Sequence, residues 1–234
     1  MNIAIIPARG GSKRIPKKNI KIFCGHPVIA YSIKAAKETN LFNHIVVSSD
    51  CEEIIEIAKK YEAEVPFKRP SELADDDCAT GSVVAHTIQE CIKLFGWKIN
   101  FVCCIYPASP LIFSCDISLA FDVLGTSTSR YVFPVARYES PIQRAFIIRD
   151  QNQLTSLYPE NQQTKTQDLE ATYYDAGQFY WGHESLWRSK KSIHNNAASI
   201  VIPSYRAIDI DTPNEWLRAE LMYKALSFEG ARYE

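Results

Sequence analysis

The chain has 234 residues, of which 46% are hydrophobic and 23% are charged, and its formal net charge is −1. A chain of this length and composition can bury one sizeable core, as globular proteins do. The near-zero net charge gives no overall attraction to nucleic acid or to a membrane surface, so we expect neither as a partner.

Two further features of the composition bear on location. No apolar run approaches the roughly 20 residues that a membrane-spanning helix requires. The seven cysteines are scattered, odd in number and without a C-x-x-C pair. This pattern favours buried thiols in a reducing compartment over disulfides or a zinc site, so we expect a cytoplasmic protein.

The N-terminal stretch predicts a strand followed by an anion-binding loop. Residues 3–6 form an apolar run that is typical of a strand buried on both faces, and Pro7 should end it. Glycines let backbone N–H groups approach phosphate oxygens, and arginine and lysine match their charge. The loop supplies both kinds of residue: Gly10, Gly11 and Ser12 together with the cations Arg9, Lys13, Arg14, Lys17 and Lys18.

The composition of this loop is also that of a solvated surface loop or of a basic patch for nucleic acid. Neither the spacing of a P-loop nor G-x-G-x-x-G is present. What favours phosphate binding is position, because ligands of α/β proteins lie outside the carboxyl ends of the strands.

The following segments alternate between strand and helix patterns, which predicts a doubly wound, mostly parallel α/β sheet. We expect Asp50, Thr80 or Ser82, and Asp116 to begin helices as capping residues. Strands are predicted at 45–48, 64–66 (an edge strand), 100–106, 131–136 and 199–203, and helices at 27–39, 53–61, 83–94, 116–124 and 214–227.

Two groups of aspartates are candidates for metal binding. Residues 75–77 are three aspartates that we interpret as loop and cap carboxylates, because nothing nearby completes a ligand set. Asp209 and Asp211 are two residues apart on extended chain, so they should point to the same side. Such a pair repels itself unless a cation such as Mg²⁺ neutralises it. The other interpretation is that Asp209 faces solvent while Asp211 caps the last helix.

The stretch ARGGSKRIPKKN at 8–19 resembles the first motif, A-R-x-x-S-K-x-[IL]-P-x-K-N, of the sialic-acid-type cytidylyltransferases. These enzymes make CMP-activated nonulosonic acids from CTP. The resemblance spans nearly the whole chain and implies a Rossmann-like nucleotidyltransferase fold. It implies that Arg9, Ser12 and Lys18 handle the triphosphate and that Asn19 contacts the nucleotide. Lys13 and Arg14 would be further anion contacts. Gly10 and Gly11 of the same motif are expected to contribute backbone N–H groups.

Two later motifs continue the resemblance. Arg69-Pro70 resembles the R-P-x-x-L-A motif used for cytosine, and Thr80 takes the position of a cytosine-contacting hydroxyl, with Ser82 beside it. A surface arginine before a rigid turn is the simpler interpretation of Arg69. The segment 107–111 resembles the family's Q-P-T-S-P-L motif and keeps Ser109, but Tyr106 replaces the glutamine.

Residues 137–175 are polar and lack a helical period, which is unusual for a loop of a compact domain. In the family this region is an arm that packs across a dimer interface and helps to close the partner's active site. We therefore expect a single domain over residues 1–234, with 137–175 as an inserted dimerisation or lid subdomain, and a homodimer.

The acceptor is expected to be a nonulosonic acid. P-I-Q-R at 141–144 and the segment 174–181 resemble the pseudaminic acid branch more than the neuraminic acid branch. Sugar contacts are predicted for Gln143, Arg144, Gln178 and Tyr180. Legionaminic and neuraminic acid remain competing acceptors, and a non-catalytic CTP-binding module is the alternative outside the enzymes.

The segment 208–212 matches the family's metal-binding motif I-D-I-D-T residue for residue. The resemblance thus implies that Asp209 and Asp211 hold Mg²⁺, and that Arg9, Lys18 and Asp211 are catalytic. Deprotonation of the sugar hydroxyl falls to Asp211 or to a metal-bound hydroxide. All of this requires Lys18 and Asp211 to meet across one cleft.

Overall fold

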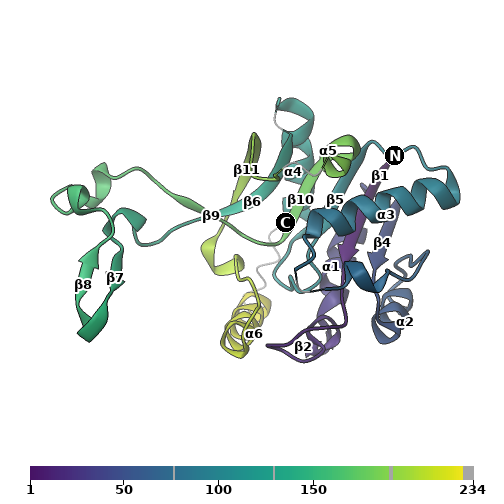
Figure 1. Cartoon of the computed structure of the whole chain (residues 1–234), viewed down its shortest axis with the longest axis horizontal. Coiled ribbons are helices and arrows are strands. Elements are labelled where there is room, and N and C mark those ends of the chain that lie inside the picture. Colours follow the sequence, from purple (N-terminus) through teal and green to yellow (C-terminus); the bar gives the residue numbers. More distant parts are fainter. Residues whose placement is uncertain (76, 129, 190–191, 229–234) are drawn as a thin grey trace.

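A seven-stranded sheet forms the centre of the computed structural model, which describes residues 1–75, 77–128, 130–189 and 192–228 (Figure 1). Asp76, one of the three consecutive aspartates, lies outside these residues. The strand order is β11-β6-β10-β5-β1-β4, and β9 pairs with β6. The strands are β1 (Asn2–Pro7), β4 (His44–Ser48), β5 (Phe101–Ile105), β6 (Tyr131–Arg137), β9 (Tyr173–Asp175), β10 (Phe179–His183) and β11 (Ala197–Ile202).

Most of the sheet is parallel. β1 runs parallel to both β4 and β5, and β6 runs parallel to β11, whereas β10 is antiparallel to its neighbours β5 and β6. This confirms the predicted doubly wound, mostly parallel sheet. The predicted edge strand at 64–66 is reduced to one bridge between Val46 and Glu64. The carboxyl ends of β1, β4 and β5 lie at one edge, where α/β proteins bind ligands.

Helices cover both faces, and β1 shows why its sequence is apolar without interruption. Ala4 and Ile6 pack in one core with α1, α2 and α4, while Ile3 and Ile5 pack in a second core with α3 and α5. Each fully buried isoleucine contributes about 1.5–3 kcal/mol. The helices are α1 (Val28–Glu38), α2 (Glu52–Lys60), α3 (Thr80–Phe95), α4 (Ser114–Thr126), α5 (Glu184–Arg188) and α6 (Pro213–Phe228), with 3-10 turns Lys18–Ile20, Ser71–Leu73, Ile142–Arg144, Asp150–Asn152, Pro159–Asn161, Thr166–Asp168 and Ser204–Arg206.

The predicted helix caps are wrong. α2 begins after Cys51, and the Asp50 carboxylate instead accepts a hydrogen bond from the backbone N–H of Gly10 at 3.0 Å. Thr80 is the first residue of α3 and makes no capping bond, and Ser82 lies inside that helix. Asp116 lies in the first turn of α4 and is buried.

A third core joins the two ends of the chain. The short hairpin of β2 (Ile22–Phe23) and β3 (His26–Pro27) packs Phe23 against Trp216 of α6, with ring centroids 5.4 Å apart. Ile15, Ile208 and Ile210 belong to the same cluster. This packing holds the N-terminal loop beside residues 208–211.

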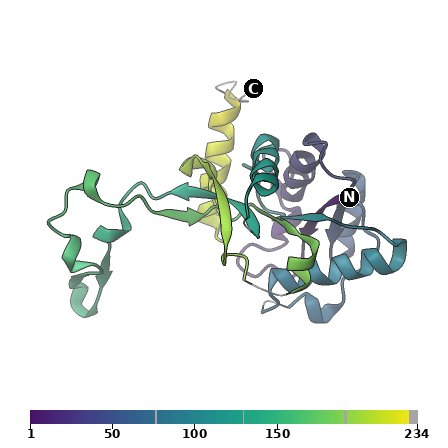
Figure 2. The ribbon, with the colours of Figure 1, turned by 90° about the horizontal axis from the view of Figure 1, so that it is seen from above.

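Between β6 and β9 the chain leaves the body as a long arm (Figures 1 and 2). Its tip carries the hairpin of β7 (Phe146–Ile148) and β8 (Leu154–Ser156). Phe146, Ile148 and Leu154 are 60%, 69% and 64% exposed. The arm covers the range predicted as an insertion, and its role in dimerisation stays a prediction.

Two expectations from composition concern the cysteines and the membrane. All seven cysteines are free, but only Cys91, Cys103 and Cys104 are buried, and Cys115 is exposed. Burial raises the pKa of the Cys91 thiol to about 12. Among the described residues, no helix combines the length and the apolar character needed to cross a membrane.

Candidate active site

A cavity of about 600 Å³ opens at the carboxyl ends of β1 and β5. Five separate segments form it: the N-terminal loop, the stretch from Arg69 to α3, the end of β5, the turn at Gly177, and residues 209–211. The predicted site residues that line it are Arg9, Ser12, Lys13, Lys18, Asn19, Arg69, Thr80, Ser109, Asp209 and Asp211.

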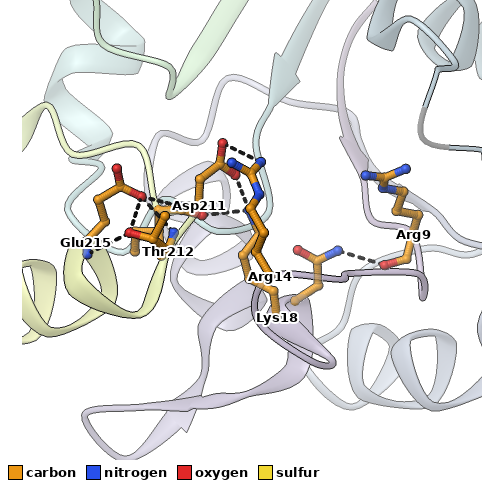
Figure 3. Close-up of polar contacts among 8 residues, drawn as sticks. Arg9, Arg14, Lys18, Asp211, Thr212 and Glu215 are labelled. Atoms are coloured by element: carbon orange, nitrogen blue, oxygen red, sulfur yellow. Dashed lines mark hydrogen bonds and ion pairs between the residues drawn. The ribbon is translucent and has the colours of Figure 1, made fainter. Parts of the chain in front are cut away.

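Lys18 and Asp211 meet in this cavity (Figure 3). Lys18 Nζ donates to Asp211 Oδ1 at 3.1 Å and to the carbonyl oxygen of Ile210 at 2.6 Å. Arg14 Nη2 lies 2.8 Å from the other carboxylate oxygen, Oδ2. The two motifs, almost 200 residues apart in sequence, therefore form one site, as the sequence interpretation requires.

The alternation of the I-D-I-D sequence sorts its side chains. Ile208 and Ile210 are buried in the third core, and Asp209 and Asp211 line the cavity. Asp209 is exposed to solvent but partly buried around its carboxyl group. This burial is the larger cause that raises the pKa of the carboxyl, and the negative charge of Asp211 is the second. Burial acts in the same sense on Asp211, but the hydrogen bonds and charges of Lys18 and Arg14 together outweigh it and lower the pKa of the Asp211 carboxyl.

A different pair of residues begins α6. Glu215 Oε2 accepts the backbone N–H groups of Asp211 and Thr212 at 2.8 and 2.7 Å, and the Glu215 N–H donates to Thr212 Oγ1 at 3.4 Å. This is a capping box, and its T-x-x-E spacing is visible in the sequence. The interpretation that Asp211 caps the helix is wrong, and its carboxylate is left for the cavity.

Arg69 is buried rather than a surface residue. Its Nε donates to Ser48 Oγ at 3.1 Å, and Nη2 donates to the Ser48 carbonyl oxygen at the end of β4. Burial lowers the pKa of its guanidinium. These bonds fix the plane of a side chain that also lines the cavity. Such a fixed fork is suited to reading the edge of a base.

Asn19 is 95% buried, since only 5% of its surface is exposed. Its Nδ2 donates to the carbonyl oxygen of Arg9 at 2.9 Å, whereas Oδ1 has no hydrogen-bond partner among the described residues. A buried amide oxygen without a partner is costly. Because Asn19 lines the cavity, a donor group of a ligand would satisfy it.

Three predicted nucleotide contacts are not in the lining of this cavity: Gly10, Gly11 and Ser82. Packing explains why position 10 is a glycine, because a Cβ atom there would lie only 2.9 Å from Cβ of Cys51. Its N–H is also taken by Asp50. Ser82 lines a second cavity of about 360 Å³ on the other side of Tyr106.

The predicted sugar contacts of the arm lie away from both cavities in the single chain. Gln143 Nε2 donates to the carbonyl oxygen of Glu170 at 2.9 Å. Arg144 Nη2 donates to the carbonyl oxygen of Thr164 at 2.5 Å. Both side chains therefore brace the arm itself.

The other two predicted sugar contacts, Gln178 and Tyr180, are buried, and neither of them lines the first or the second cavity. Gln178 Nε2 donates to the carbonyl oxygen of Arg206 at 2.7 Å. The Tyr180 hydroxyl donates to Asp175 Oδ2 at 2.9 Å, and His194 Nε2 lies 3.0 Å from the same oxygen. The sequence interpretation missed His194, since no motif marks it.

Tyr106 connects the two cavities. It lines both of them, and its hydroxyl interacts with Thr80 on one side and Tyr180 on the other. Burial raises the pKa of this hydroxyl. A chain of polar groups thus runs from Thr80 through the two tyrosines to Asp175.

Several known proteins are similar to this chain. The family described as cytidylyltransferase matches residues 3–205. A pseudaminic acid cytidylyltransferase of Campylobacter jejuni (strain 81-176) is 40% identical over 95% of this chain and 96% of its own length. The CMP-N,N'-diacetyllegionaminic acid synthase of Legionella pneumophila is 32% identical, over 93% of this chain and 94% of its own length.

A solved structure shares the fold. CMP:2-keto-3-deoxy-manno-octonic acid synthetase complexed with CTP superimposes with a TM-score of 0.69 at 13% identity, covering 96% of this chain and 99% of that one. At so low an identity the likeness concerns the fold alone. The match over residues 3–205 and the relatives of 40% and 32% identity show that the chain is a member of the cytidylyltransferase family.

Proposed function

We propose that this cytidylyltransferase transfers CMP from CTP to the anomeric hydroxyl of a nonulosonic acid, and that the acceptor is pseudaminic acid. The observation that carries the proposal is the meeting of Lys18 and Asp211 across one cavity. The acceptor is taken from the 40% identical relative, which is a pseudaminic acid cytidylyltransferase.

The cations of the cavity suit a triphosphate. Arg9, Lys13 and Lys18 line it together with the hydroxyl of Ser12. In this proposal they neutralise the phosphates and stabilise the negative charge that grows on the leaving pyrophosphate. Lys18 and Arg9 act as catalytic residues through this charge, and the cavity holds the sugar hydroxyl in line with the bond that breaks.

Asp209 and Asp211 are the residues that would hold Mg²⁺. Their carboxylate oxygens are the hard ligands that this ion prefers, and both line the cavity. Among the described residues no group of three His, Cys, Asp or Glu side chains surrounds a common point. Phosphate oxygens and water would complete the shell, as is usual for Mg²⁺. The ion would supply positive charge that polarises the α-phosphate.

Base recognition is assigned to Arg69 and Thr80, with Asn19 and Ser109 as further nucleotide contacts. Arg69 and Asn19 are both buried and polar, and all four line the cavity. A buried polar group that lacks its partner is penalised, so such a site can discriminate strongly between bases.

The exposed apolar tip of the arm supports a homodimer. Phe146, Ile148 and Leu154 form a small hydrophobic surface far from the body of the chain. We propose that a second copy covers it. In the dimer, Gln143 and Arg144 then contact the sugar held by the other copy.

The free cysteines are consistent with the proposed cytoplasmic location, where thiols stay reduced.

Product analysis tests the main proposal. The protein is incubated with CTP, Mg²⁺ and pseudaminic, legionaminic or N-acetylneuraminic acid in turn, and CMP-sugar and pyrophosphate are quantified. We expect the highest kcat/KM with pseudaminic acid. A preference for another acid would overturn the acceptor, and CTP binding without any product would identify a regulatory module instead.

A further inference from the structure

The structure sorts the cations of the N-terminal loop into different roles. Lys17 turns away from the cavity, and its Nζ lies 2.7 Å from Glu53 Oε1. Arg14 and Lys18 both bind Asp211, one on each carboxylate oxygen, at 2.8 and 3.1 Å (Figure 3). Both oxygens of Asp211 are therefore occupied by cationic groups of the same chain.

The carboxylate of Asp209, unlike that of Asp211, is not paired with a cation among the described residues. Within the described parts of the chain its carboxylate has no hydrogen bond or ion pair, although it lines the same cavity. A divalent cation that approaches the pair finds one open carboxylate and one that two cations already neutralise. Those two positive charges also repel the incoming ion. Full use of the pair therefore requires that one cation leave Asp211.

Arg14 is the cation that is free to leave. The side chain of Lys18 is 21% exposed and is held by a second bond to the carbonyl oxygen of Ile210. The side chain of Arg14 is 64% exposed, and among the described residues Asp211 is its sole hydrogen-bond or ion-pair partner. Arg14 also lines the cavity, so its guanidinium is within reach of an entering polyphosphate. A guanidinium can bind a phosphate group with two parallel hydrogen bonds, whereas an exposed ion pair such as that of Arg14 with Asp211 contributes little.

We propose that Arg14 is an exchangeable counter-ion: it neutralises Asp211 in the free protein and moves to the triphosphate when the nucleotide enters, which frees Asp211 Oδ2 for the metal ion. The proposal rests on the proposed function of the cavity. It couples the two ligands, because each one favours the state in which Arg14 has left Asp211. Such coupling is reciprocal, so Arg14 should affect both affinities.

The test measures the affinity for the metal ion without nucleotide and the affinity for the nucleotide without metal ion. Mn²⁺ replaces Mg²⁺ as the probe, and unbound Mn²⁺ is counted by electron paramagnetic resonance during a titration without nucleotide. CTP binding is measured by calorimetry in excess EDTA. The variants are Arg14→Gln and, as a matched control, Lys17→Gln, which removes the same charge from the same loop outside the cavity.

Arg14→Gln should bind Mn²⁺ about two- to fivefold tighter than the parent protein, since an exposed ion pair no longer competes. The same variant should bind metal-free CTP more weakly, by about fivefold or more, because a charged phosphate contact is lost. Lys17→Gln should change either affinity by less than about twofold, because surface charges of this kind contribute little. Tighter binding of Mn²⁺ together with weaker binding of CTP distinguishes the exchange from a general loosening of the loop, which would weaken the binding of both ligands.

An unchanged or weaker Mn²⁺ affinity in Arg14→Gln would overturn the exchange, as would an equal effect of Lys17→Gln. Asp211→Asn separates this failure from that of the proposed function. If Asp211→Asn binds Mn²⁺ as well as the parent, the metal assignment itself is wrong. If it loses Mn²⁺ while Arg14→Gln has no effect, the metal site stands and the exchange alone is rejected.

Discussion

The buried ion pair between Arg206 and Asp116 gives the sharpest prediction about stability. Arg206 Nη1 donates to Asp116 Oδ2, and Nη2 lies 3.4 Å from Oδ1. The two side chains are only 8% and 11% exposed, and the guanidinium carbon lies 4.2 Å from the centre of the Phe113 ring. The pair fastens the start of α4 to the segment that leads to Asp209.

We predict that Arg206→Met lowers the free energy of unfolding by about 3–5 kcal/mol, because it leaves the Asp116 carboxylate buried without a counter-ion. Because the whole free energy of unfolding of a protein is typically about 5–15 kcal/mol, this loss would be a large fraction of it. Methionine keeps most of the volume and the contact with Phe113, so packing loss is a minor part of the effect. The double variant Asp116→Asn/Arg206→Met removes the stranded charge and should recover part of the loss.

Urea unfolding at neutral pH, followed by circular dichroism, measures both variants against the parent chain. The slope of the free energy with urea should stay unchanged, so that the midpoints report stability directly. A free energy of unfolding for Arg206→Met within about 1 kcal/mol of the parent value would contradict the prediction, because the pair would then contribute no more than an exposed ion pair does. A double variant no more stable than the single one would show that the stranded charge is not the cause.

Three further predictions concern single residues of the site. Lys18→Ala should lower kcat by about 10²–10³, as removal of a group that stabilises transition-state charge does; a near-normal kcat in steady-state assays would reject its role. Arg69→Ala should reduce the ratio of kcat/KM for CTP over UTP, and an unchanged ratio would count against base recognition. Glu215→Gln should destabilise the fold by about 0.3–1 kcal/mol at pH 7, because the amide keeps an acceptor oxygen for the capping box but loses the negative charge at the helix N-terminus. Hydrogen bonds from Asp211 and Thr212 lower the pKa of Glu215, so its contribution is present above the carboxyl's unfolded pKa and is lost as pH falls through the folded one. Thermal melts across pH 3–7 should therefore converge for the parent and Glu215→Gln at the acid end.

The sequence was sufficient for features that depend on neighbouring residues. The apolar run at 3–6 requires burial on both faces, and β1 is buried on both faces by the two cores. The alternation of isoleucine and aspartate at 208–211 likewise fixes which side chains face the third core and which face the cavity. Such local patterns are decided by the geometry of extended chain.

The predicted caps failed because a distant partner competes with the local rule. Asp50 is positioned for a helix start, but the backbone N–H of Gly10, 40 residues away, takes its carboxylate. Asp116 is 90 residues from Arg206, the cation that holds it inside the core. Nothing in the spacing of either aspartate reveals these partners. Capping preferences are modest in energy, so a buried charge pair or a needed backbone acceptor overrides them.

The same reasoning explains why the two cavities differ in how well a sequence reveals them. The first is built largely from loop segments, two of which directly follow β1 and β5, and its residues form contiguous motifs around Lys18 and Asp211. The second draws Tyr131 from the first position of β6, Trp187 from the short helix α5 and His194 from a connecting segment. These residues are scattered because side chains from unrelated elements pack together there. We therefore expect differences between acceptor branches of the family to be spread over such isolated positions, while the loop and the aspartate pair keep their motifs.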